Sequence, residues 1–116
     1  MFGGLKRDST VARGIEIESD EPGTGDVAAR GKRVVLRVRG SLHRGDVFMD
    51  SERESFRLGE RVVIAGLEYG VEGMRVGGRR RIRVPPHLGY REAGVPEKIP
   101  SNALLFFDVE LLDVQD

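Results

Sequence analysis

Residues 62–74 of this 116-residue chain read Val-Val-Ile-Ala-Gly-Leu-Glu-Tyr-Gly-Val-Glu-Gly-Met. Apolar side chains recur here at spacings of three, four and three, at Ile64, Leu67, Val71 and Met74, which is typical of one buried face of a helix. The glycines in this stretch each cost a helix roughly 1 kcal/mol relative to alanine. We therefore predict one short helix that is stable only because other elements cover it.

Elsewhere in the chain, apolar residues alternate with polar ones, as expected for strands with one buried face. The predicted strands span 14–19, 33–39, 47–49, 79–84 and 104–114. Sixteen glycines imply many turns, and no crossover helices are predicted, so the strands should pair antiparallel. The predicted fold class is α+β, with a curved antiparallel sheet of about five strands wrapped around the helix.

The length of the chain suits one domain, which we place at residues 14–116. Residues 1–13 show no hydrophobic period and are predicted to form a flexible leader. No apolar run is long enough to cross a membrane, and the first residues lack the apolar core of an export signal. The chain also has no cysteine, which is compatible with a reducing cytoplasm, so we expect a cytoplasmic protein. We also expect a monomer without a membrane partner.

Nineteen basic and nineteen acidic side chains cancel, so overall charge does not favour binding to nucleic acid. Arginines nevertheless gather on or beside two predicted strands, at Arg37, Arg39, Arg75, Arg79, Arg80, Arg81 and Arg83. Carboxylates take outward positions on other strands, at Glu16, Glu18, Asp108 and Glu110. Opposite charges on neighbouring strands attract each other, so we predict a charge-paired, solvated face. A nucleic-acid-binding surface is the alternative interpretation.

Side chains that perform covalent or metal chemistry are scarce. The two histidines, His43 and His87, have no Asp, Glu or Cys at a metal-ligand spacing and no serine in a nucleophile context. The glycines at 77–78 are not followed by the Gly-Lys-Ser/Thr of a phosphate-binding loop. We therefore predict no metal site and no cofactor. A catalyst with this sequence would have to work through an apolar cavity.

Four ordered segments between Gly31 and Leu112 resemble the FKBP-type peptidyl-prolyl cis-trans isomerases. They are residues 58–66, 70–81, 84–90 and 99–112. The resemblance implies a curved antiparallel sheet around one short helix, with Xaa-Pro segments bound in an aromatic-lined cleft between helix and sheet. The short 85–100 segment also implies that the inserted chaperone domain of some bacterial relatives is missing.

The resemblance implies roles for individual residues. Catalytic roles fall on Phe48, Asp50, Tyr90 and Phe107, and substrate-binding roles on Val38, Phe56, Val63, Ile64, Leu67 and Ile99. The phenylalanines and Leu67 would enclose the proline ring, while the Ile64 amide and the Tyr90 hydroxyl would bond to flanking carbonyl groups.

Some positions depart from the family pattern. Val38 stands where many members carry Tyr, Leu67 where they commonly carry Trp, and Glu54 where many carry a second Phe. The usual Phe-Asp pair reads Phe-Met-Asp at residues 48–50. Because a shift of one residue reverses the face of a strand side chain, Asp50 would reach the pocket only if the backbone bulges. We therefore expect an apolar pocket of altered shape.

The function that the resemblance implies is a prolyl isomerase of broad substrate range that assists protein folding without a cofactor. Its partners would be proline-containing peptides and unfolded or partly folded proteins, with macrolides as further ligands. Acceleration would come from moving the Xaa-Pro bond out of water, which solvates the planar amide better than the twisted transition state. A catalytically weak proline-peptide binding or chaperone module is the alternative.

Overall fold

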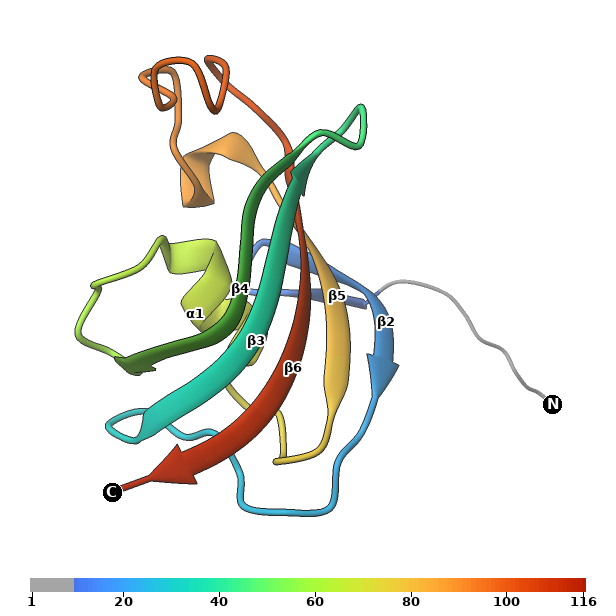
Figure 1. The fold of residues 1–116 in the computed structure, drawn as a ribbon, viewed down its shortest axis with the longest axis vertical. Helices are drawn as coiled ribbons and strands as arrows, with labels where there is room; N and C mark the ends of the chain where they lie inside the picture. The colour runs from blue at the N-terminus through green and yellow to red at the C-terminus, as the bar shows by residue number, and fades with distance from the viewer. Residues whose placement is uncertain (1–9) are drawn as a thin grey trace, which may run out of the picture.

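The structure, a computed structural model, describes residues 10–116. Its elements are β1 (Thr10–Ala12), β2 (Ile15–Glu21), β3 (Arg33–Leu42), β4 (Val47–Arg57), α1 (Ala65–Val71), β5 (Arg79–Val84), a 3-10 turn (Pro86–Leu88) and β6 (Leu105–Gln115). Figure 1 shows a curved sheet with α1 against its concave face and the loop that follows β5 at one end. The predicted fold class is confirmed.

The strands form one antiparallel sheet in the order β1-β2-β5-β6-β3-β4. Compared with the predicted sheet of about five strands, the short edge strand β1 is additional. It pairs with β2, with Thr10 opposite Ile17. β1 falls inside residues 1–13, the segment predicted to be a flexible leader, so residues 10–12 of that segment form a strand of the sheet. The rest of that leader, residues 1–9, lies outside the described residues.

β4 is longer than its predicted range of 47–49. It pairs with β3 along most of its length, from Val47 opposite Ser41 to Arg57 opposite Arg33. The prediction stopped early because residues 50–55 are polar. β4 is an edge strand of the sheet with one face in solvent, where polar side chains are stable.

α1 occupies only the centre of the predicted 62–74 stretch. Ile64 is still extended, with φ −60° and ψ 149°, and Gly73 has φ +93°, so the helix ends between them. The predicted apolar stripe is confirmed on its buried side, where Leu67 and Val71 are 3% and 0% exposed. Both residues join the single core that lies between α1 and the sheet.

Two glycines explain how a glycine-rich helix is stable at this place. A Cβ on Gly66 would overlap the Val84 side chain, and a Cβ on Gly70 would overlap Ile82 Cδ1. Val84 and Ile82 are fully buried residues of β5. The helix therefore lies directly on β5 because these two positions carry no side chain, and close packing offsets their poor helix propensity.

Gly70→Ala is expected to destabilise the protein by about 1–3 kcal/mol through overpacking. Helix propensity alone predicts the opposite change in stability, because alanine is the better helix former by roughly 1 kcal/mol. The added methyl group would meet the buried Ile82 side chain. Urea unfolding followed by circular dichroism measures the change.

Ile82→Val is the matched background, because it removes Cδ1, the atom that the new methyl group would overlap. In that background, Gly70→Ala should cost markedly less free energy of unfolding. Equal costs in the two backgrounds would contradict a close approach of α1 to β5 at this point.

Candidate functional site

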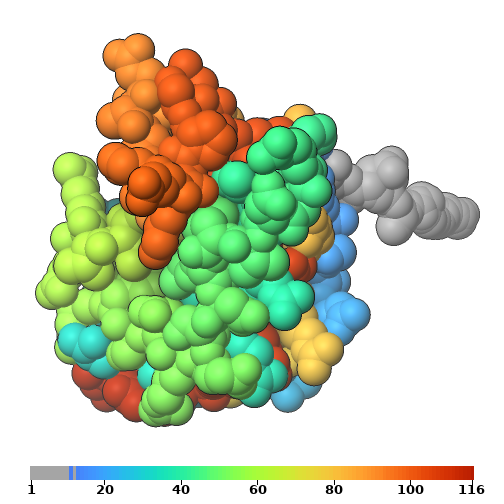
Figure 2. Space-filling model, turned by 45° about the horizontal axis from the view of Figure 1, so that its top comes forward, coloured from blue at the N-terminus to red at the C-terminus, as the bar shows by residue number. Residues whose placement is uncertain are grey.

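An open hollow of about 690 Å³ lies between the β3–β4 turn and the loop at 93–100. Its apolar lining consists of Leu42, Val47, Phe48, Ala93, Val95, Pro96, Ile99 and Pro100. The charged residues of the lining are exposed, whereas its buried and half-buried members are apolar. Figure 2 shows the loop, in orange, projecting beside the green surface of β4 and its turn. The less exposed side chains of the hollow can therefore contact an apolar ligand, while its charged side chains are in solvent.

The loop wall is an ordered hairpin. Pro85 and Pro86 end β5, since proline cannot donate a backbone hydrogen bond. Further along, Val95 and Ile99 exchange two backbone hydrogen bonds of 2.8 Å each. Glu97 at the tip has φ +67°, a left-handed conformation that lets the chain turn back. This hairpin holds Ile99, 6% exposed, against the core.

A pair of aromatic rings forms the other wall. The centroids of the Phe48 and Phe107 rings are 5.7 Å apart and the rings stand at 86°, the edge-to-face arrangement that aromatic pairs favour. Gly40 on β3 makes room for them, because a Cβ there would lie 2.6 Å from Phe48 Cζ and 3.0 Å from Phe107 Cε1. Phe48 remains half-exposed and faces the hollow, while Phe107 is buried beneath it.

A bulge in β4 decides which side chains face the core. Gly40 is opposite Met49 and Ser41 is opposite Val47, so Phe48 is the extra, unpaired residue. Bulges re-aim side chains, and here both Phe48 and Met49 pack against the core.

The same bulge corrects the prediction for Asp50. Asp50 lies opposite Arg39 in the register, and its carboxylate pairs with that guanidinium at 3.2 Å on the outer face of the sheet. The backbone does bulge, as the prediction required, but it does so before Met49 and therefore turns Met49 inward. The structure does not place Asp50 in the hollow.

Several predicted wall residues lie in the core and not along the hollow. Their exposed fractions are 0% for Val38, 4% for Phe56, 3% for Leu67 and 2% for Phe107. All belong to the cluster of buried apolar side chains under α1. Of the residues predicted to line the substrate cleft, the structure brings Phe48 and Ile99 to the surface of the hollow. The hollow is therefore lined by fewer of the predicted residues than the family resemblance implied.

The predicted polar contacts stand outside this lining. Tyr90 is 36% exposed and begins the loop wall, where its carbonyl accepts the Gly94 N–H at 3.0 Å. Val63 and Ile64 pack against the core just before α1. The Ile64 carbonyl accepts two helix N–H groups, whereas its own N–H has no hydrogen-bond acceptor among residues 10–116. That N–H is available to a ligand.

The outer face of the sheet is a second, charged groove. Arg81 pairs with Glu18 at 3.2 Å and with Asp108 at 2.7 Å. Partial burial lowers the pKa of the Arg81 guanidinium, but these carboxylates outweigh that effect and raise its pKa above the ordinary value. Glu16 pairs with Arg83, and Glu110 with Arg37. The predicted pairing of opposite charges across this face is confirmed.

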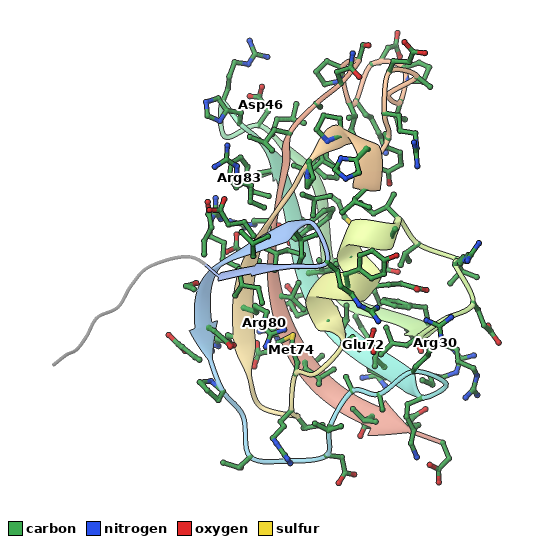
Figure 3. The ribbon with its side chains drawn as sticks, turned by 180° about the vertical axis from the view of Figure 1, so that it is seen from behind. Arg30, Asp46, Glu72, Met74, Arg80 and Arg83 are labelled. Atoms are coloured by element: carbon green, nitrogen blue, oxygen red, sulfur yellow. The ribbon has the colours of Figure 1, made fainter. Side chains whose placement is uncertain are left out.

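Arg80 points the other way, toward the helix. It makes two hydrogen bonds of 3.2 Å to the Asp20 carboxylate and one of 3.0 Å to the Gly70 carbonyl. Figure 3 shows Arg80 beside Met74, below α1, and Arg83 further along the same strand. Five of the seven arginines named in the sequence thus pair with carboxylates of the protein itself, namely Arg37, Arg39, Arg80, Arg81 and Arg83.

Two kinds of site are not found among residues 10–116. No group of three or more His, Cys, Asp or Glu side chains is placed to hold a metal ion. No helix in this part of the chain is both long and apolar enough to cross a membrane.

Sequence reasoning missed the inward position of Met49 and the contributions of Leu42 and Val95 to the hollow. A local signal existed in Gly40, because a glycine inside a strand pattern often marks a bulge or a close approach. Leu42 and Val95 gave no such signal, because they are far apart in the sequence and come to line the same hollow only when the chain folds.

Comparison with known proteins agrees with the geometry. Residues 25–112 match the family model described as FKBP-type peptidyl-prolyl cis-trans isomerase. FK506-binding protein 4 of Neurospora crassa is 44% identical over 109 residues, covering 90% of this chain and 23% of the relative. The 46 kDa FK506-binding nuclear protein of Spodoptera frugiperda is 38% identical over 114 residues, covering 95% and 28%. The chain spans about a quarter of the length of these curated relatives.

Solved structures of similar shape carry related names. FkpA from Escherichia coli superimposes with a TM-score of 0.85 at 36% identity, covering 95% of this chain and 53% of FkpA. A peptidyl-prolyl cis-trans isomerase from Pseudomonas syringae gives a TM-score of 0.85 at 30% identity, covering 96% of this chain and 84% of that protein.

The geometry predicts opposite outcomes for two nearby residues of β4. Phe48→Ala should weaken the binding of a Leu-Pro peptide at least tenfold, about 1.4 kcal/mol, because the half-exposed ring faces the hollow. Asp50→Asn should leave binding within twofold of the unaltered protein, because its carboxylate points to the outer face. Titration of ¹⁵N-labelled protein measures both affinities. A large loss on Asp50→Asn would mean that the bulge is misplaced.

Proposed function

The chain belongs to the FKBP-type peptidyl-prolyl cis-trans isomerase family, and from this premise we propose that it accelerates rotation about Xaa-Pro bonds in peptides and proteins. The observation that carries the proposal is the apolar hollow beside the edge-to-face Phe48–Phe107 pair. Such a surface can receive a pyrrolidine ring and strip water from the bond beside it.

The chemistry needs no nucleophile. Rotation about the peptide bond passes a barrier of roughly 18–20 kcal/mol that arises from amide resonance. At the twisted transition state this resonance is lost, and the carbonyl oxygen carries less negative charge than in the planar amide. Water therefore stabilises the planar form more than the transition state, and an apolar surface removes that difference. A thousandfold acceleration requires a reduction of about 4 kcal/mol in the barrier.

We assign the roles as follows. Phe48 and Ile99 hold the proline ring from the two walls of the hollow, and buried Phe107 keeps Phe48 in place. The Ile64 N–H, which has no acceptor among the described residues, donates to a substrate carbonyl. The exposed Tyr90 side chain offers its hydroxyl to a second carbonyl at the edge. Together these contacts would hold the peptide in one orientation, with the Xaa-Pro bond beside the apolar side chains.

The substrates proposed for this site are proline-containing segments of unfolded or partly folded proteins, with macrolides as further ligands. The shallow, open shape of the hollow supports broad selectivity, because few side chains would contact the residue before proline. We further propose a monomer that works in the cytoplasm, in keeping with the absence of cysteine. A relative described as nuclear shows that proteins of this family occur in other compartments as well.

The test is exchange spectroscopy on a Leu-Pro peptide in the presence of the 116-residue chain. We expect the cis-trans exchange rate to rise with protein concentration. Ile99→Ala should lower kcat/KM about tenfold, because it removes part of one wall, and Tyr90→Phe should lower it severalfold. Glu52→Gln, on the outer face, is the matched control and should have no effect.

Peptide binding without faster exchange would contradict the isomerase and leave a proline-peptide binding or chaperone module. Equal losses for Glu52→Gln and Ile99→Ala would show that the hollow is not where the reaction takes place.

A further inference from the structure

Glu68 is a carboxylate in an unusual place. Among residues 13–116, Ser41 and Glu68 are the only buried polar or charged residues, and Glu68, in the first turn of α1, is 8% exposed. Burying a carboxylate is costly unless hydrogen bonds replace its water. The fold therefore supplies partners for it, and the identity of those partners indicates what Glu68 does.

Both partners are backbone N–H groups of the segment that leads into α1. Glu68 Oε2 accepts the Arg61 N–H at 3.0 Å and the Gly59 N–H at 3.3 Å. We call residues 59–64 the pre-helix segment. Gly59 and Arg61 have φ angles of +99° and +61°, and the left-handed region is unfavourable for an arginine. Hydrogen bonds to a charged acceptor are among the strongest in proteins, so they offset this strain.

The backbone of Glu68 holds the other end of the same segment. Its N–H donates to the Ile64 carbonyl at 3.3 Å. One residue thus fixes the pre-helix segment twice, through its side chain at the start and through its main chain at the end. Between these points Val62 is 64% exposed, so packing alone does not hold that part of the segment.

We propose that Glu68 is a positioning residue of the isomerase site, which keeps the pre-helix segment in the conformation that directs the Ile64 N–H at the substrate. The inference rests on the proposed function. Glu68 itself does not touch substrate, because its carboxylate is buried and bonds to backbone amides. It acts through the peptide groups that it holds.

A set of variants separates hydrogen bonding from packing. Glu68→Met keeps volume, burial and helix propensity but removes the acceptor. Glu68→Gln keeps an acceptor oxygen at the same reach and should rescue the site. Glu68→Asp keeps the carboxylate but is shorter by one methylene and cannot reach both amides. Glu72→Gln is the matched control, because Glu72 lies four residues further along the chain, pairs with Arg13 at 3.1 Å, and makes no side-chain hydrogen bond to residues 59–64 within the described part of the chain.

The first measurement uses the protein without substrate. In Glu68→Met, hydrogen exchange of the Arg61 amide should accelerate at least tenfold, and the ¹⁵N shifts of Val62, Val63 and Ile64 should change. Glu68→Gln and Glu72→Gln should resemble the unaltered protein. Unchanged exchange and shifts in Glu68→Met would overturn the inference. If that variant does not fold, Glu68→Asp gives the same test with the same expected result.

The second measurement is isomerisation of the Leu-Pro peptide. In Glu68→Met the Ile64 N–H would no longer be directed at the substrate carbonyl. That hydrogen bond to substrate is present in both the ground state and the transition state, and its loss raises KM and leaves kcat unchanged. We therefore expect KM to rise about tenfold with kcat within twofold. A merely structural role would lower the active fraction and thus kcat, and a Glu68→Gln variant as impaired as Glu68→Met would also overturn the proposal. If the unaltered protein shows no acceleration, the proposed function fails, while the amide measurements still decide whether Glu68 holds the segment.

Discussion

The close approach of α1 to β5 is the contact on which the site depends. Gly66 and Gly70 let the helix backbone lie against Val84 and Ile82, and on the same buried side of the helix Leu67 belongs to the core. The helix has only residues 65–71, too few for stability in isolation. Packing against the sheet therefore holds the helix, and the helix in turn fixes the segment that carries the Ile64 amide.

The aromatic wall of the hollow is a consequence of the bulge in β4. The β4 bulge leaves Phe48 unpaired and turns it toward Phe107, while Gly40 provides the space. The buried and half-buried side chains that line the hollow are apolar, and a network of paired charges lies on the outer face of the sheet. This separation suits a reaction that gains from excluding water and requires no proton transfer.

The sequence predicted those features that depend on burial of one face. The spacing of apolar residues in 62–74 and the alternation in 104–114 identified the helix and β6, because each packs one side on the core. β1 and the polar half of β4 were missed because neither shows an apolar alternation: β1 has only three residues, and residues 50–55 of β4 are all polar. The family resemblance implied a site role for Phe48, and the structure places this residue along the hollow. The direction of Asp50 depends on strand register, which no local spacing reveals.

The central claim is that an Xaa-Pro segment binds beside Phe48 and Ile99. Intermolecular nuclear Overhauser contacts in a complex of the ¹³C-labelled protein with an unlabelled Leu-Pro peptide test it most directly. We expect contacts from the proline ring protons to the Phe48 ring and the Ile99 methyl groups, both of which line the hollow. A bound peptide whose proline contacts instead the outer face, at Arg37 or Arg39, would contradict the account.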